Sequence, residues 1–224
     1  YLREKRTIEI KNAKKPILYV GGGIIHSKAN QELFDLATKF NIPVVTTLMG
    51  RGAFPDGHEL CLEMPGMHGN YTATTSIQKS DLLIAIGVRF DDRVTANPSF
   101  FAQNAKVIHA DIDPAEIGKV REAQVPIVGD AKSVILGLID ALQDEELDTK
   151  NWINELNSMK TEHPLSYDQD ENGPLKVPFV LEELQNLTEE EAVVVSGVGQ
   201  HQMWISQHWN FTEPNTWLNS GGLG

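Results

Sequence analysis

The sequence predicts an α/β protein, with a doubly wound parallel sheet followed by a linker and an incomplete second α/β domain. Short apolar runs alternate with segments of helical periodicity between residues 15 and 142. The apolar runs are nearly continuous, which indicates strands buried on both faces. Such strands form parallel sheets covered by helices on both sides. Beyond residue 142 the composition becomes acidic and polar, and a new apolar run begins only near residue 192.

Five strands are predicted for the sheet. They cover residues 16–20, 43–47, 81–86, 106–111 and 125–128. Helices are predicted at residues 31–40, 71–79 and 131–142, and a further one starts at Pro114. The helix at 31–40 has its apolar residues on one face, as an amphipathic helix does. Asp113 and Asp130 each stand where a helix N-cap is expected.

Three segments are expected along the chain. Residues 1–142 form the central doubly wound α/β domain, residues 143–176 a linker, and residues 177–224 the first part of another domain. The linker contains a short helix at 151–161 that packs one or two apolar side chains on a neighbour. Residues 177–187 are predicted to form a helix, and residues 192–196 a buried strand.

Composition excludes several classes of function. The 224 residues carry a formal net charge of −12, and an acidic protein does not attract phosphate backbones, so nucleic acid is not an expected partner. Cys61 is the only cysteine, which excludes an internal disulfide and fits a reducing compartment. No apolar run reaches the roughly 18 residues of a membrane span. No His, Cys, Asp or Glu spacing matches a zinc site.

Glycines and charged residues follow the predicted strands, where open α/β sheets bind ligands. Gly21, Gly22 and Gly23 follow the first strand, where glycine allows close backbone approach to a ligand. A tight turn without a ligand explains them equally well. Residues 87–94 follow the third strand and hold two Arg and two Asp, which suits phosphate and hydroxyl groups or a surface salt-bridge cluster. Asp111 ends the fourth strand, a common position for a hydroxyl acceptor.

Two further motifs lie outside these strand ends. Residues 64–69, Met-Pro-Gly-Met-His-Gly, combine methionines with a histidine and glycines, which favours packing against a flat ring or a mobile core loop. Residues 197–204, Gly-Val-Gly-Gln-His-Gln-Met-Trp, and residues 220–224, Ser-Gly-Gly-Leu-Gly, are typical of a cofactor site. A diphosphate-binding domain is expected to start here, so we expect the chain to be part of a longer enzyme.

In this order the motifs closely resemble the large catalytic subunit of acetohydroxyacid synthase, or acetolactate synthase, a thiamine-diphosphate enzyme family. The resemblance covers almost the whole chain. It implies a central FAD-binding domain followed by the beginning of a thiamine-diphosphate-binding domain. The implied reaction condenses two 2-ketoacids, pyruvate with pyruvate or 2-ketobutyrate, with loss of CO2 in branched-chain amino-acid biosynthesis. FAD is bound in this family without a net redox role.

The resemblance also implies site residues. FAD is expected to contact Gly21, Gly22, Gly23, Thr46, Thr47, Leu48, Gly66, Met67, His68, Gly87, Arg89, Asp91, Arg93, Val94, Asp111, Ile112, Glu116, Asp130 and Ala131. Thiamine diphosphate is expected at Val198, Gly199, Gln200, His201 and Gly222. Asp92 and Arg93 correspond to the substrate channel, where Arg93 is the partner of a ketoacid carboxylate. The activating glutamate and the magnesium motif are expected outside this chain, which is therefore expected to be inactive alone.

The implied partners are 2-ketoacids, further catalytic subunits in a homodimer or tetramer, and a regulatory small subunit. The implied location is the cytoplasm in a bacterium and a plastid or mitochondrion in a eukaryote. Two alternatives stay open. One is another thiamine-diphosphate carboligase or decarboxylase, such as glyoxylate carboligase or the FAD-free catabolic acetolactate synthase. The other is a non-catalytic nucleotide-binding module, which leaves residues 197–204 unexplained.

Overall fold

A five-stranded parallel sheet forms the centre of the computed structural model, which describes residues 2–189 and 192–221. The strands are β1 (Pro16–Val20), β2 (Val44–Thr46), β3 (Leu82–Ile86), β4 (Lys106–Asp111) and β5 (Val125–Val128). Each predicted strand is present within two residues of its expected bounds, and the α/β fold class is confirmed. The strand order is β2-β1-β3-β4-β5, so the winding reverses between β1 and β3, where doubly wound sheets bind ligands.

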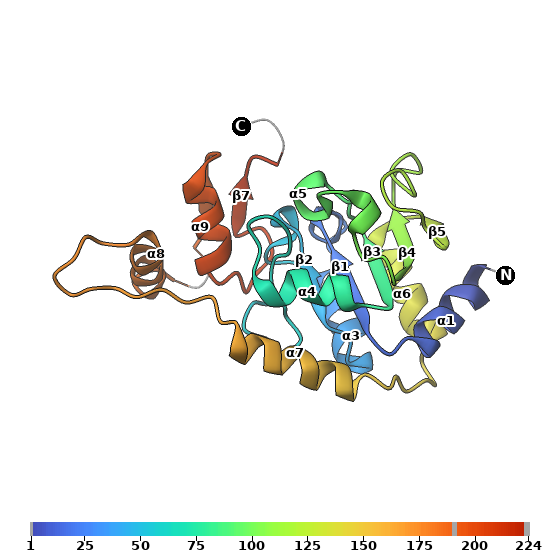
Figure 1. Ribbon diagram of the computed structural model, residues 1–224. Helices are drawn as coiled ribbons and strands as arrows, with labels where there is room; N and C mark the ends of the chain where they lie inside the picture. The colour runs from blue at the N-terminus through green and yellow to red at the C-terminus, as the bar shows by residue number, and fades with distance from the viewer. Residues whose placement is uncertain (1, 190–191, 222–224) are drawn as a thin grey trace.

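Helices cover both faces of this sheet (Figure 1). One layer consists of α2 (Gly22–His26), α3 (Asn30–Phe40) and α6 (Ala131–Ala141), with α1 (Leu2–Asn12) beside α6. The other consists of α4 (Tyr71–Lys79) and α7 (Lys150–Glu162). Because side chains alternate along a strand, Leu18 and Val20 face the first layer, and Ile17 and Tyr19 face the second. The sheet therefore separates two buried apolar cores.

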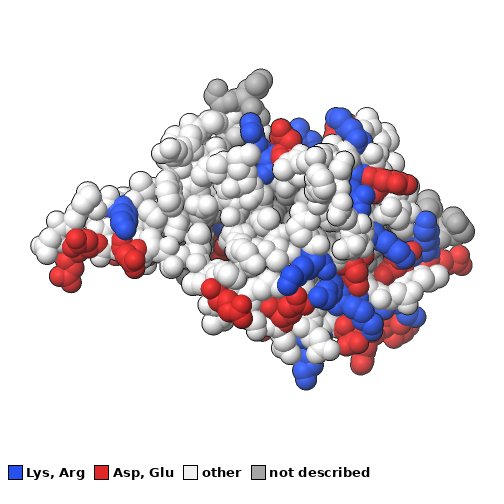
Figure 2. All heavy atoms as spheres, in the orientation of Figure 1, with Lys and Arg blue, Asp and Glu red and all other residues white. Residues whose placement is uncertain are grey.

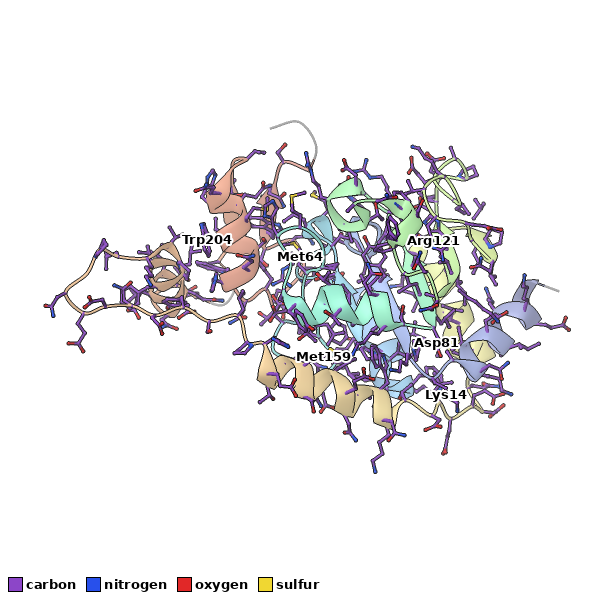
Figure 3. All side chains as sticks on the ribbon, in the orientation of Figure 1. Lys14, Met64, Asp81, Arg121, Met159 and Trp204 are labelled. Carbon is purple, nitrogen blue, oxygen red and sulfur yellow. The ribbon has the colours of Figure 1, made fainter. Side chains whose placement is uncertain are left out.

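Helix α7 belongs to the second core although it lies far along the chain. The Trp152 side chain is 1% exposed, and its indole Nε1 donates a hydrogen bond to the Pro16 carbonyl at 3.2 Å. Leu156 and Met159 are buried in the same cluster, and Met159 lies under α4 in Figure 3. The predicted helix at 151–161 is confirmed, and it packs three apolar side chains on its neighbours instead of one or two.

The helix predicted to start at Pro114 is wrong. Residues 114–118 form turns, with the Asp113 carboxylate accepting a hydrogen bond from the Ala115 N–H at 2.8 Å. Gly118 has a φ of +75° in this segment, and Ile112 is 74% exposed. Of the residues that follow Pro114 up to residue 120, only Val120 packs against a core, so the segment gains too little from packing to continue as a helix.

The remaining elements are short or lie in the last part of the chain. Short helical turns are η1 (Leu48–Gly50), α5 (Asp92–Thr95) and η2 (Pro98–Phe100). The last part comprises α8 (Val177–Asn186), β6 (Val194–Ser196), α9 (Gln200–His208) and β7 (Trp217–Asn219). The strands β6 and β7 pair in parallel. The expected burial of the strand at 192–196 is wrong, because Val195 is 71% exposed; it stands beside Leu218, itself half exposed.

An aromatic cluster packs the last part of the chain on the main body. Leu181, Trp209, Phe211 and Trp217 are buried together, and Leu48 packs against them. The Trp217 indole Nε1 donates to the Leu48 carbonyl at 3.1 Å. This contact places α9 and β7 beside the upper edge of the sheet in Figure 1. No helix within residues 2–189 and 192–221 is long and apolar enough to span a membrane.

Candidate functional site at the carboxyl edge of the sheet

Three glycines join the loops that follow β1 and β3. A Cβ added to Gly21 would lie 2.5 Å from the Gly87 carbonyl oxygen, and one added to Gly23 would lie 2.6 Å from the Gly87 Cα. Gly87 itself has a φ of +62°, which a side chain disfavours. These glycines therefore allow two backbone segments to touch at the switch point of the sheet. The tight-turn interpretation holds for Gly21 and Gly23, and it also explains why the two loops share one rim.

A cavity of about 760 Å³ lies along this rim, and we call it the first cavity. Nine residues predicted to contact FAD line it: Gly22, Gly23, Gly87, Arg89, Asp111, Ile112, Glu116, Asp130 and Ala131. They come from the ends of β1, β3, β4 and β5. His26, Ser27 and Met49, which no sequence motif singled out, also line it. Gly221 lines it too, although the motif at 220–224 had placed that glycine in a diphosphate site. Met49 reaches the cavity through its contact with Gly22, which the sequence does not give.

Some polar groups of the first cavity already form hydrogen bonds or ion pairs within the protein, and others are free to bind a ligand. The Asp130 carboxylate caps α6 by accepting from the Ser133 N–H at 3.2 Å. Asp111 Oδ1 accepts from the Asp113 N–H at 2.9 Å, and its other oxygen has no hydrogen-bond partner among the described residues. Glu116 pairs with Lys119 at 2.8 Å. An acceptor such as Asp111 at a strand end suits a ribose hydroxyl.

A second cavity of about 490 Å³ lies between the loop at 64–68, α5 and the start of α9. Eight predicted residues line it: Leu48, Met67, His68, Arg93, Val94, Val198, Gly199 and Gln200. Residues predicted for FAD and for thiamine diphosphate thus meet at one place. Gly221 lines both cavities, and the adjacent Leu48 and Met49 line one each, so the two cavities adjoin.

The loop at 64–69 is fixed by its backbone. Gly66 has a φ of +100°, and a Cβ there would stand 2.6 Å from the Arg93 carbonyl oxygen. The Met67 N–H donates to the same oxygen at 2.9 Å. On the other side, the Gln207 side-chain amide of α9 donates to the His68 carbonyl at 2.7 Å. Met64 is buried and Met67 is 64% exposed, so Met67 is the methionine available to a ligand.

Arg93 and its neighbours are exposed at the entrance of the second cavity. The Asp91 carboxylate caps α5 by accepting from the Arg93 N–H at 3.0 Å, and it lies 3.8 Å from the Arg89 guanidinium. Within the described ranges no carboxylate forms an ion pair with Arg93. Its guanidinium is thus available for a carboxylate or phosphate of a ligand.

Several predicted residues line neither cavity among the described residues. They are Gly21, Thr46, Thr47, Gly66, Asp91, Asp92 and His201. Thr46 is fully buried, and its hydroxyl accepts from Arg51 at 3.4 Å. The Thr47 N–H donates to the Val20 carbonyl at 2.9 Å. Thr46 and Thr47 therefore shape the backbone beneath the site. Gly222 lies outside the described residues.

Other candidate chemistry is not supported. Within residues 2–189 and 192–221, no group of three or more His, Cys, Asp or Glu side chains is arranged for a metal ion. Burial raises the pKa of the Cys61 thiol well above its ordinary value, so it is not a thiolate nucleophile. On the face shown in Figure 2, Lys and Arg side chains are interspersed with Asp and Glu and form no continuous basic band in the described part.

The chain matches the family model of the thiamine pyrophosphate enzyme, central domain, over residues 5–138. It therefore belongs to the thiamine pyrophosphate enzymes. Its sequence is 54% identical over 219 residues to the acetolactate synthase of Mycobacterium leprae, covering 96% of this chain and 35% of that protein.

Two further relatives are acetolactate synthases. Identity is 51% to the acetolactate synthase large subunit of Corynebacterium glutamicum, covering 96% of this chain and 35% of that protein. It is 45% to the chloroplastic acetolactate synthase 1 of Nicotiana tabacum, covering 96% and 32%. The chain thus spans about a third of the length of the curated relatives it matches.

Proposed function

We propose that the first cavity binds FAD, and that the protein containing this chain condenses two 2-ketoacids with loss of CO2, as an acetolactate synthase. One observation carries the FAD proposal. Nine residues from four strand ends, which the family resemblance implies as FAD contacts, line a single cavity at the switch point of the sheet. The reaction itself is proposed from the names of the relatives.

The residues of the first cavity fit a dinucleotide. Gly22 and Gly23 leave the rim without side chains, so a phosphate can approach the backbone. Arg89 supplies a cation that is 63% exposed, and Asp111 supplies an acceptor for hydroxyls. In this arrangement Asp111 and Glu116 would hold the adenosine, and Met67 at the second cavity would contact the flavin.

The second cavity fits the phosphates of thiamine diphosphate at one end. Helix α9 begins at Gln200, after Gly199 with a φ of +147°, and the free N–H groups of a helix N-terminus bind anions. When bound, thiamine diphosphate supplies the electron sink for decarboxylation and carbon–carbon bond formation. Arg93 binds the ketoacid carboxylate through its guanidinium, and Leu48, Met67 and Val94 supply apolar lining beside it. The magnesium ligands and the activating glutamate are proposed to come from elsewhere in the whole protein.

We also propose the division into residues 1–142, 143–176 and 177–224, and an assembly of two or four catalytic subunits with a regulatory small subunit. The division at 143 is compatible with α7 completing the core of the central domain, since a linker can contribute a packed helix. These proposals rest on the family resemblance, and gel filtration of the whole protein tests the assembly.

Titration of the 224-residue chain with FAD and with ADP tests the FAD site. We expect weak binding, with ADP nearly as effective as FAD, because one wall of a dinucleotide site buries only part of the ligand. Absence of binding by both ligands would refute the site. FAD binding far tighter than ADP would show instead that the flavin wall is complete in this chain.

Assays of the whole protein test the reaction. CO2 release and acetolactate formation from pyruvate are expected. Activity with glyoxylate in place of pyruvate would favour the alternative carboligase, and absence of bound flavin absorbance would favour the FAD-free enzyme. A protein that binds nucleotide and releases no CO2 from either ketoacid would be the non-catalytic module.

A further inference from the structure

His109 has an unusual setting for a residue next to the first cavity. It lies on β4 with 1% of its surface exposed, and it is not among the residues that line the cavity. Its Nε2 lies 2.9 Å from the Val88 carbonyl oxygen. A carbonyl only accepts, so Nε2 is the protonated nitrogen. Nδ1 is buried and has no partner among the described residues, as expected for a neutral ring with a single proton.

Aromatic rings fix the loop after β3 at Phe90, the residue that follows Arg89. The strand register places Tyr19 beside Ala85, and Ala85 beside His109. The Phe90 ring contacts both rings, with centroids 5.5 Å from Tyr19 and 5.0 Å from His109, edge to face. Phe90 adopts a φ of +54°, which a non-glycine residue keeps only when its surroundings hold it. The loop after β3 is therefore fixed at residues 88 and 90.

Arg89 lies between these two fixed positions. The Val88–Arg89 peptide is trans, so the Val88 C=O and the Arg89 N–H point in opposite directions across one plane. The carbonyl points at His109, and the Arg89 N–H therefore points away from it. Within the described residues this N–H has no hydrogen-bond acceptor, although Arg89 lines the first cavity. An N–H that the protein leaves unpaired needs a partner from solvent or from a ligand.

We infer that His109 is a positioning residue that keeps the Arg89 backbone N–H available as a hydrogen-bond donor to a phosphate group in the first cavity. The inference rests on the proposed nucleotide site and adds a residue that does not touch the ligand. The Arg89 guanidinium adds a cation on the same residue, so backbone and side chain favour the same anionic group.

NMR of the 15N-labelled chain with added ADP tests this role. In the wild type, the Arg89 amide proton is expected to shift downfield on addition of ADP, together with amides elsewhere in the cavity such as Gly129 and Ile112. His109→Leu removes the donor to Val88, so the Arg89 shift is expected to shrink and ADP affinity to fall about tenfold, the size of one lost hydrogen bond to a charged group. His109→Gln keeps an N–H at a similar reach and is expected to restore both.

Tyr19→Phe is the matched control. It changes the same aromatic group but removes only a hydroxyl that has no partner in the described structure, so ADP binding is expected to stay within twofold. If cavity amides respond to ADP and the Arg89 amide does not, or if it responds equally in His109→Leu, the role of His109 is refuted and the nucleotide site stands. If no cavity amide responds in the wild type, the nucleotide site itself fails, and the inference with it.

Discussion

Asp56 and Phe211 exchange two hydrogen bonds across 155 positions of the chain. The Asp56 N–H donates to the Phe211 carbonyl at 3.0 Å, and the Phe211 N–H donates to the Asp56 carboxylate at 2.7 Å. Arg51 completes the group with two bonds to that carboxylate, at 2.8 and 2.6 Å. Burial raises the pKa of Asp56, and Arg51 and the Phe211 N–H act against the rise. The last part of the chain is thereby joined to the segment that also carries Leu48 and Met49.

Removal of the Asp56 carboxylate is expected to destabilise this junction strongly. Asp56→Ala leaves the Arg51 guanidinium buried and unpaired, which costs about 3–5 kcal/mol of unfolding free energy. Urea denaturation measures the loss, and hydrogen exchange at the Phe211 amide locates it. The control is Asp148→Ala at the exposed pair with Lys14, where both side chains are more than 60% exposed and about 0–1 kcal/mol is expected. Equal effects of the two variants would contradict this account of the junction.

Trp152 is expected to be the main anchor of α7. Trp152→Ala empties a buried position and costs about 3–5 kcal/mol, whereas Trp152→Phe loses mainly the bond to the Pro16 carbonyl and some volume. Trp204→Ala on α9 is the matched control, because Trp204 is 37% exposed. Thermal and urea unfolding compare the three. If Trp204→Ala is as destabilising as Trp152→Ala, α7 is not an essential part of the core.

The helices and strands could be predicted from the sequence where the hydrophobic periodicity agrees with the burial in the structure. The helix at 71–79 has its predicted bounds, and the strands at 16–20 and 106–111 are fully or largely buried. The prediction failed where a local sequence pattern was not accompanied by packing against the rest of the fold. Asp113-Pro114 is a good helix start, but among the residues that follow, up to residue 120, only Val120 packs against a core. Val193 and Val195 are apolar, yet the described residues leave them more than half exposed.

The same distinction applies to the site. Strand-end loops were predictable, because the carboxyl ends of parallel strands share one edge of the sheet. Long-range backbone contacts were not, because they depend on pairing between segments far apart in sequence. The position of Met49 beside Gly22 and the bond between Gln207 and His68 are examples. The hydrogen bond between His109 and the Val88 carbonyl could not be predicted from the sequence either, since a histidine inside a buried strand is usually a packed side chain.

Gly23 and its neighbour Gly22 are expected to respond differently to alanine. The methyl group of Gly23→Ala meets the Gly87 backbone at 2.6 Å and forces two loops apart, which costs about 1–3 kcal/mol or prevents folding. In Gly22→Ala the nearest atom is 3.3 Å away, so stability changes by only about 1 kcal/mol. Because Gly22 lines the first cavity, ADP affinity is nevertheless expected to fall. Urea unfolding and ADP titration separate the two effects, and similar stability of both variants would argue against backbone contact at this turn.

Mildly acidic pH is expected to destabilise the fold through two histidines. Burial lowers the pKa of His109 and of His208, while unfolded histidine has a pKa of about 6.5. Between that value and the lower folded pKa, the unfolded state binds more protons, so the unfolding free energy falls as pH decreases below about 6.5 and is flat above it. Each histidine contributes at most about 1.4 kcal/mol per pH unit. Denaturation at pH 7.5 and 5.5 measures the slope. If the double variant His109→Gln/His208→Gln shows the same dependence of unfolding free energy on pH, other groups cause that dependence.

Substitution of Arg93 is expected to change ligand binding and turnover without changing the stability of the fold. Its side chain is exposed and lines the second cavity, so Arg93→Ala leaves the unfolding free energy within about 0.5 kcal/mol. In the whole protein, the variant is expected to lose turnover with the second ketoacid and to bind FAD less tightly, because a charge-assisted bond contributes about 1.5–3 kcal/mol. Arg93→Lys keeps the charge without the two-pronged geometry and is expected to recover activity only in part. Steady-state kinetics against both ketoacids, with FAD titration, measure these effects. Lys14→Ala, at an exposed cation that lines neither cavity, is the control. Wild-type kinetics in Arg93→Ala would remove Arg93 from the proposed substrate site.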